Sequence, residues 1–202
     1  MRTLGVAMEQ ITAALIGGFL AAGTGWLLQS RLEASRLSRT KRLLIIGIVD
    51  DLKSSIELYS RVIDEWEKSQ TIWFTTLNEL RESRQTYLKN RDWLVLLKDE
   101  SFRQRIFKYY HRSTDHINLL ESQQRRKYDI QAKLNEVVRD IRLRNESLSL
   151  EEERQLVIRA MHAEDRELDG LSKLIPQSIQ HLRDYRDEAK DLSEVLEKGK
   201  NH

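Results

Sequence analysis

The sequence predicts an all-α protein in which a single N-terminal transmembrane helix continues into a cytoplasmic helical bundle or coiled coil. Three observations lead to this prediction. Pro176 is the sole proline and glycine occurs eight times in 202 residues, so little in the chain interrupts helices. One stretch near the N-terminus carries no charged side chain, and the rest of the chain repeats apolar residues at helical spacing.

We expect four parts along the chain. A short extracytoplasmic tail at 1–9 precedes a transmembrane helix at 10–30, which is flanked by Glu9 and Arg31. A helical body with a basic, membrane-proximal hinge follows at 31–145, and a C-terminal helical or coiled-coil segment occupies 146–202. The uncharged stretch spans about 30 Å at a rise of about 1.5 Å per residue, which matches the hydrocarbon core of a bilayer.

Two other interpretations of residues 10–30 fit the sequence less well. A helix buried in a soluble core would lose about 1 kcal/mol for each of its interior glycines. A cleaved signal peptide would end its apolar stretch at a small-residue cleavage site. Here the apolar run continues past Ala21, Ala22 and Gly23 to Trp26 and Leu28. We therefore predict a membrane span.

The distribution of basic residues predicts the orientation of the span. Arg2 is the one basic residue before it. The residues expected to contact lipid head groups come just after it and are Arg31, Arg36, Arg39, Lys41 and Arg42. Because basic residues stay on the cytoplasmic side, we expect a single-pass protein of the inner (cytoplasmic) membrane, with its N-terminus outside and its body in the cytoplasm.

Small residues line one side of the predicted span. They form one row with a four-residue step, Ala13, Gly17, Ala21 and Gly25, and a second row beside it, Ala14, Gly18 and Ala22. Small side chains let two helix backbones approach closely in a membrane. The pattern predicts that the protein forms a homo-oligomer through this face.

Apolar stripes predict the helices of the body. The first stripe is Leu44, Ile48, Leu52, Ile56, Tyr59, Ile63 and Trp66, and the second is Ile72, Leu77, Leu80 and Tyr87. We expect a turn at 89–92, a short helical segment at 93–97, and a long helix from about Asp99. Trp66, Trp73 and Trp93 lie on or beside these stripes, and we expect them in the core.

The C-terminal segment has the clearest periodicity. A loop is expected at 144–149, and Ser149 with Glu152 predicts a capping box for the next helix. The seam that follows has heptad spacing and consists of Leu168, Leu171, Ile175, Ser178, Leu182, Tyr185, Ala189, Leu192 and Leu196. Pro176 must kink this helix or lie in its first turn. The seam can pair within the chain or between chains.

The composition favours no metal or cofactor. The chain has no cysteine, which excludes disulfides and thiolate ligands, and none of its five histidines completes the Glu-x-x-His motif of carboxylate-bridged metal sites. A net charge of +2 gives no general attraction for nucleic acid. We predict no cofactor and no enzymatic activity, and we expect the lipid bilayer and a cytoplasmic protein as partners.

Arg105 and His111 form the one pair with catalytic spacing. The five residues between them resemble the spacing of HEPN ribonucleases, although Ile106 stands where those sites usually carry a polar residue. The resemblance implies that Arg105 would stabilise phosphate charge and His111 would transfer a proton. A nucleic-acid partner is expected only under this interpretation.

The overall layout is similar to that of the membrane accessory protein of type VI-B CRISPR systems. The similarity consists of one span, a basic hinge and a helical body with the degenerate HEPN-like spacing of Arg105 and His111. It implies subunits whose N-terminal helices surround a pore, and a role in antiphage defence. The sequence thus leaves three functions open: a membrane-tethered scaffold that recruits a cytoplasmic partner, an oligomeric pore that depolarises the membrane, and a membrane-bound HEPN-like ribonuclease.

Overall fold

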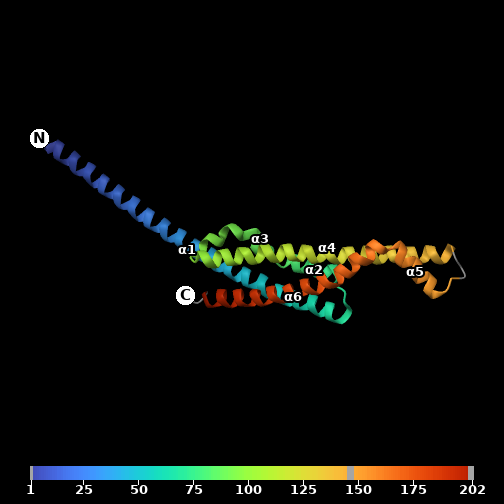
Figure 1. Cartoon of the computed structure of the whole chain (residues 1–202). Helices are drawn as coiled ribbons and strands as arrows, with labels where there is room; N and C mark the ends of the chain where they lie inside the picture. The colour runs from blue at the N-terminus through green and yellow to red at the C-terminus, as the bar shows by residue number, and fades with distance from the viewer. Residues whose placement is uncertain (1, 145–147, 200–202) are drawn as a thin grey trace. The chain divides into compact units, whose positions relative to one another are not determined.

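The computed structural model describes the backbone of residues 2–144 and 148–199 and the side chains of residues 24–144 and 148–198. Every regular element in this part of the chain is helical, which confirms the predicted all-α fold (Figure 1). The elements are α1 (Arg2–Ser69), α2 (Phe74–Glu82), α3 (Gln85–Asn90), the 3-10 helix η1 (Arg91–Leu96), α4 (Glu100–Arg144), α5 (Leu150–Ala160) and α6 (His162–Gly199).

The predicted membrane span falls largely on residues whose side chains lie outside this description. Among the helical residues whose side chains are described, no stretch is both long enough and apolar enough to cross a bilayer. The predicted tail at 1–9 and residues 10–23 of the predicted span lie outside the described side chains. The span therefore stays a prediction.

The chain packs as two units, residues 1–44 and residues 45–202, and α1 contributes to both. In the second unit, α1 buries the face predicted from its apolar stripe. Ile48, Leu52, Tyr59, Ile63 and Trp66 are buried there, and Ile56 is half-buried; Leu44, the last residue of the first unit, is also buried. The helix ends where Gln70 adopts a positive φ of 53°, and its N–H donates to the Trp66 carbonyl at 2.8 Å. Lys127 then satisfies the Gln70 carbonyl at 2.9 Å, so the helix end keeps its hydrogen bonds.

The turn predicted at 89–92 is wrong, because the chain stays helical there. α3 ends at Asn90 and η1 begins at Arg91. A carboxylate oxygen of Asp51 on α1 accepts the backbone N–H of Tyr87 in the first turn of α3, at 2.8 Å. Arg103 on α4 donates to the Leu97 carbonyl just after η1. Residues distant in sequence thus supply the terminal hydrogen bonds that these short helices lack locally.

The heptad seam packs within the chain. In Figure 1, α6 runs beside α4, and these two helices share an extensive contact. Seven seam residues are buried and the other two, Leu168 and Tyr185, are half-buried. The buried seven are Leu171, Ile175, Ser178, Leu182, Ala189, Leu192 and Leu196. Pro176 lies inside α6 rather than in its first turn, so the first-turn alternative is wrong.

The capping box predicted for α5 is confirmed. The Ser149 hydroxyl accepts the backbone N–H of Glu152 at 3.3 Å, and a Glu152 carboxylate oxygen accepts the backbone N–H of Ser149 at 2.9 Å. This reciprocal pair satisfies two of the free donors at the start of the helix. Residues 145–147 of the predicted loop lie outside the described part of the chain.

The prediction for the three tryptophans is right for one of them. Trp66 is 8% exposed, but Trp73 and Trp93 are 60% and 45% exposed, so their assignment to the core is wrong. Trp73 lies in extended backbone just before α2, where successive side chains point to opposite sides, and its neighbour Ile72 occupies the buried side. η1 has about three residues per turn and buries Leu94, so it turns the adjacent Trp93 away from the core.

Gly47 permits a close approach between α1 and α3, which gives a first prediction. A Cβ at Gly47 would lie 2.3 Å from Cγ2 of Thr86, whereas a Cβ at Gly170 would have nothing within 4 Å. We predict that Gly47→Ala lowers the free energy of unfolding by about 1–3 kcal/mol through overpacking. Chemical denaturation measures the change.

Two further variants test the cause of this loss. Thr86→Ser combined with Gly47→Ala should restore most of the stability, because serine lacks the clashing methyl group and keeps the hydroxyl that hydrogen-bonds to Asp51. Gly170→Ala should leave stability unchanged or raise it by up to about 1 kcal/mol, the gain in helix propensity. Equal losses at both glycines would contradict this account.

Candidate functional site

The basic residues expected at lipid head groups lie on the first unit of the chain, on the described part of α1. Arg31, Arg36, Arg39 and Arg42 are exposed, and Lys41 is half-buried. None of the five forms an ion pair with any residue that the structure describes. Glu33 is the one acidic residue between Thr24 and Leu44, and it accepts a hydrogen bond from Gln29 at 3.2 Å. The segment therefore carries a net charge of +4, five basic residues less one acid.

The same part of α1 exposes its large apolar side chains. Trp26 and Leu28 are 69% and 64% exposed. The complete set consists of Trp26, Leu27, Leu28, Leu32, Leu37 and Leu43. A Cβ at Gly25, the last residue of the predicted small-residue face, would have nothing within 4 Å. The other six residues of that face, Ala13, Ala14, Gly17, Gly18, Ala21 and Ala22, lie outside the described side chains. The six large apolar side chains are therefore at least half exposed on the described part of the first unit.

A buried arginine joins three helices of the second unit. Arg84, which is 2% exposed, donates to the Tyr59 hydroxyl of α1 at 2.6 Å and to the Thr114 hydroxyl of α4 at 2.7 Å. It also donates to the Tyr110 carbonyl at 3.4 Å, and it forms no ion pair with any described residue. A buried charge is costly without compensation. The hydroxyls and the carbonyl supply that compensation here, so the residue between α2 and α3 is tied to both long helices.

Tyrosines surround this guanidinium. The rings of Tyr87 and Tyr110 stack with centroids 3.8 Å apart, and the Tyr109 hydroxyl donates to the Tyr59 hydroxyl at 3.4 Å. Burial raises the pKa of the Tyr109 and Tyr110 phenols well above the ordinary value, so both remain protonated. The Nε of Arg84 and the hydroxyl of Tyr110 have no partner among the described atoms. The arrangement provides no nucleophile beside a base, so we assign it a structural role.

Asp51 of α1 binds the first turn of α3, next to the cluster of Arg84 and the tyrosines. Its carboxylate is 8% exposed and accepts the Tyr87 N–H. Burial raises the pKa of the Asp51 carboxyl, and the hydrogen bonds from Tyr87 and Thr86 partly oppose this rise. The carboxylate also lies at the positive end of the α3 dipole. Because Asp51 belongs to α1, its hydrogen bond with Tyr87 attaches α3 to α1.

A second polar cluster lies in the contact between α4 and α6. His116 Nε2 donates to the Ser178 carbonyl at 2.8 Å, and the Ser178 hydroxyl donates to Gln123 at 2.9 Å. The rings of His181 and Tyr185 lie beside His116, with centroid separations of 5.2 Å and 5.5 Å. Burial lowers the pKa of His116. Ser178, the one polar position of the buried seam, thus receives its partners from α4.

His116 predicts a pH dependence of stability. A histidine whose pKa is lower in the folded state stabilises the fold fully above its unfolded pKa of about 6.5, and this contribution is lost as the pH falls. We predict that acidification from about pH 7 to about pH 5 lowers the Tm of the wild type more than that of His116→Gln. The glutamine amide can still donate to Ser178 but does not titrate. His111→Gln, at a 68% exposed side chain, should keep the wild-type pH dependence, and equal dependence in all three proteins would contradict the assignment.

The structure separates the two residues of the HEPN-like spacing. Arg105 forms an ion pair with Asp191 of α6. His111 is exposed, stacks against Phe107 with centroids 6.1 Å apart, and lies 3.6 Å from a carboxylate oxygen of Asp115. Six residues along one α-helix turn two side chains about 120° apart and separate them by about 9 Å. Each residue therefore has its own neighbours within the described chain, and the catalytic role of the pair stays a prediction.

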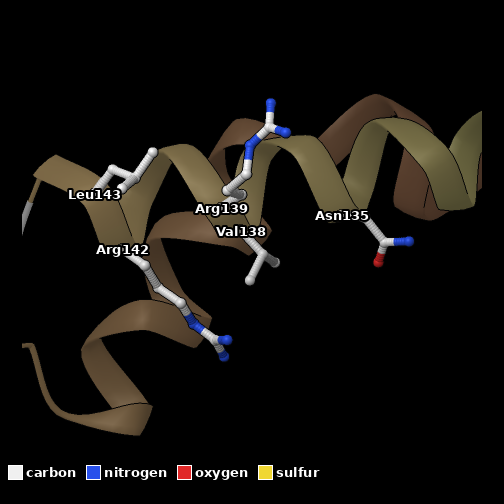
Figure 2. Close-up of a pocket in the computed structure, with 5 residues that line it drawn as sticks. All are labelled: Asn135, Val138, Arg139, Arg142 and Leu143. Atoms are coloured by element: carbon white, nitrogen blue, oxygen red, sulfur yellow. The ribbon is translucent and has the colours of Figure 1, made fainter.

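An open hollow of about 520 Å³ lies beside the last turns of α4 (Figure 2). Its lining residues are Asn135, Val138, Arg139, Arg142 and Leu143. Two of them are arginines and none is acidic. Among the described residues, no group of three or more histidines and carboxylates is placed to hold a metal ion.

Sequence reasoning missed the main polar residues of the core. Arg84 could have been found, because it lies between Leu80 and Tyr87 of the second apolar stripe, at steps of four and three. His116 could have been found, because it continues the stripe of Tyr109, Ser113 and Leu120 at steps of four and three. Searches against protein-family models, curated proteins and solved structures found no match.

Proposed function

We propose that this chain is a membrane-tethered, self-associating helical protein whose second unit binds a protein partner in the cytoplasm. One observation carries the proposal: the first described side chains of α1 include six exposed large apolar residues, and among them lie four exposed arginines and the half-buried Lys41, none of which forms an ion pair with a described residue. Exposed apolar surface costs about 25 cal/mol per Å² in water, so such a stretch favours a lipid or protein contact. The adjoining uncharged residues 10–23 and the basic cluster are what a single span of this orientation requires.

A role in antiphage defence extends this proposal. It rests on the layout shared with the type VI-B accessory proteins, and the cytoplasmic partner would then be another component of the defence system. The pore and ribonuclease functions predict different results. A pore would let dye enter cells on expression, and a ribonuclease would cleave RNA and lose that activity in His111→Ala. No feature of the described residues favours either one.

The first test is membrane attachment. The full chain should remain with the membranes after extraction at alkaline pH. Ile16→Arg together with Leu20→Arg should release it, because each arginine at the centre of a span costs about 2.5–3.5 kcal/mol on insertion scales. A matched control adds the same charge at Leu88 and Leu119, which are 52% and 50% exposed on the second unit. Release of the wild type by the same extraction would refute the tether.

The second test is association through the span. Gly17→Leu with Ala21→Leu should reduce crosslinked oligomers in detergent, because the bulk prevents close approach of two helices. Gly23→Leu is the matched control, since on a helical wheel it lies on the side away from both small-residue rows. Equal loss in all variants, or no loss in any, would argue against a specific small-residue face.

A further inference from the structure

α5 is incompletely covered by its own chain. None of its side chains is buried, and Leu150 is 82% exposed, the highest value among the large apolar side chains that the structure describes. Ile158 is 41% exposed. A helix of 11 residues is shorter than the roughly 12–15 residues that an isolated helix needs in water. Its capping box and the ion pair of Arg142 with Glu153 hold its start, but its apolar residues lack a full partner.

The end of α4 carries an exposed apolar side chain and an exposed basic side chain that could complement α5. In Figure 2, Arg139 and Leu143 extend to one side of α4, while Arg142 extends to the other. Arg142 already has a partner, because its Nε and Nη2 donate to the two carboxylate oxygens of Glu153 at 2.9 Å and 2.8 Å. Arg139 has a 68% exposed side chain and, among the described residues, forms an ion pair only with its neighbour Asp140, at 3.9 Å; Leu143 is 73% exposed. An apolar side chain and an available cation thus border one hollow.

The charges at the start of α5 complement this hollow. The first turn holds Glu151, Glu152 and Glu153 directly after Leu150. Glu152 is used in the capping box and Glu153 in the pair with Arg142. Glu151 accepts a hydrogen bond at 3.1 Å from the neutral amide of Gln155 and forms no ion pair with a described residue. Leu150 can therefore complement Leu143, and the carboxylate of Glu151 can complement Arg139.

We propose that the end of α4 and the start of α5 form a two-fold contact with a second copy of this chain. Leu150 of each copy packs on Leu143 of the other, and Glu151 of each copy pairs with Arg139 of the other. Both complementary surfaces lie at the same end of α4, so one two-fold axis forms both halves of the contact. The proposal specifies a surface for the self-association proposed above, and it rests on that function.

A second copy fits better than the other occupants. An anionic membrane would attract Arg139 but repel Glu151, and the two lie at one end of the unit. An unrelated protein would need an apolar and acidic pair for Leu143 and Arg139, and an apolar and basic pair for Leu150 and Glu151. A second copy of this chain already carries both pairs. The contact is small, so we expect it to be weak between free molecules and strong between molecules held together by a shared membrane anchor, which raises their effective concentration.

Engineered cysteines test the contact cleanly because the chain has none of its own. Full-length copies carrying only Leu143→Cys are co-expressed with differently tagged copies carrying only Leu150→Cys and are then oxidised in the membrane or, if extractable, in buffer. Disulfide-linked heterodimers must form between chains, because each chain has a single thiol. Val95→Cys with Leu150→Cys is the matched control, since Val95 is 70% exposed and lies on η1, remote from α5.

A charge exchange tests the pairing. Arg139→Glu or Glu151→Arg alone should reduce the heterodimer about tenfold, because both symmetric ion pairs become repulsive. The double variant should restore it, since the exchanged charges again face each other across the axis. Circular dichroism and Tm establish that each variant folds, and folded variants are the ones compared.

The outcomes separate this proposal from the proposed function. The proposed contact is supported if Leu143→Cys and Leu150→Cys crosslink well above the control, and if the single charge variants lose this crosslink and the double variant restores it. Crosslinking no greater than that of the control overturns it. If the span variants still reduce oligomers in that case, the proposed self-association stands without this contact. If the wild type is neither membrane-bound nor oligomeric, the proposed function fails as well.

Discussion

The packing of α6 along α4 decides which surfaces remain for other molecules. The heptad seam has the spacing with which separate chains often pair, yet seven of its nine residues are buried inside one chain and the other two are half-buried. Because this apolar stripe is already covered, it cannot serve as an intermolecular coiled coil without unfolding the second unit. Any association of the folded chain therefore uses surfaces outside the seam. The two proposed here are the predicted small-residue face of the span and the partly covered end of α4 and α5.

Polar contacts set the register of this packing. His116 meets Ser178 at the one polar position of the buried seam, and Arg84 joins α1 and α4 through the hydroxyls of Tyr59 and Thr114. Apolar side chains alone tolerate shifts along a helix, whereas buried donors and acceptors must meet their partners or remain unsatisfied. The segment from α2 to η1 contains three short helices, and a buried arginine and an aspartate from α1 hold it in place.

α1 has two different environments along a single helix. From Ile45 to Trp66 its apolar face is covered by the second unit, as in an ordinary globular protein. From Trp26 to Leu43 its apolar and basic side chains are exposed together. A surface helix of a soluble protein normally carries its apolar side chains on one face and its charged side chains on the opposite face. The absence of that separation in the described first unit is what favours a lipid contact over a purely aqueous surface.

The sequence by itself determined the helical class, the buried stripe of α1, the long helix near Asp99 and the capping box at Ser149, because each depends on residues within a few turns of one another. Tertiary structure alone decided that the seam closes within the chain, that Trp73 and Trp93 are exposed, and that α3 and η1 replace the expected turn. It also decided the burial of Arg84. For the seam, for α3 and for Arg84 the deciding partner is distant in sequence, such as Asp51 for α3 and Thr114 for Arg84. No local pattern records which distant side chain will complete a hydrogen bond or cover an apolar face.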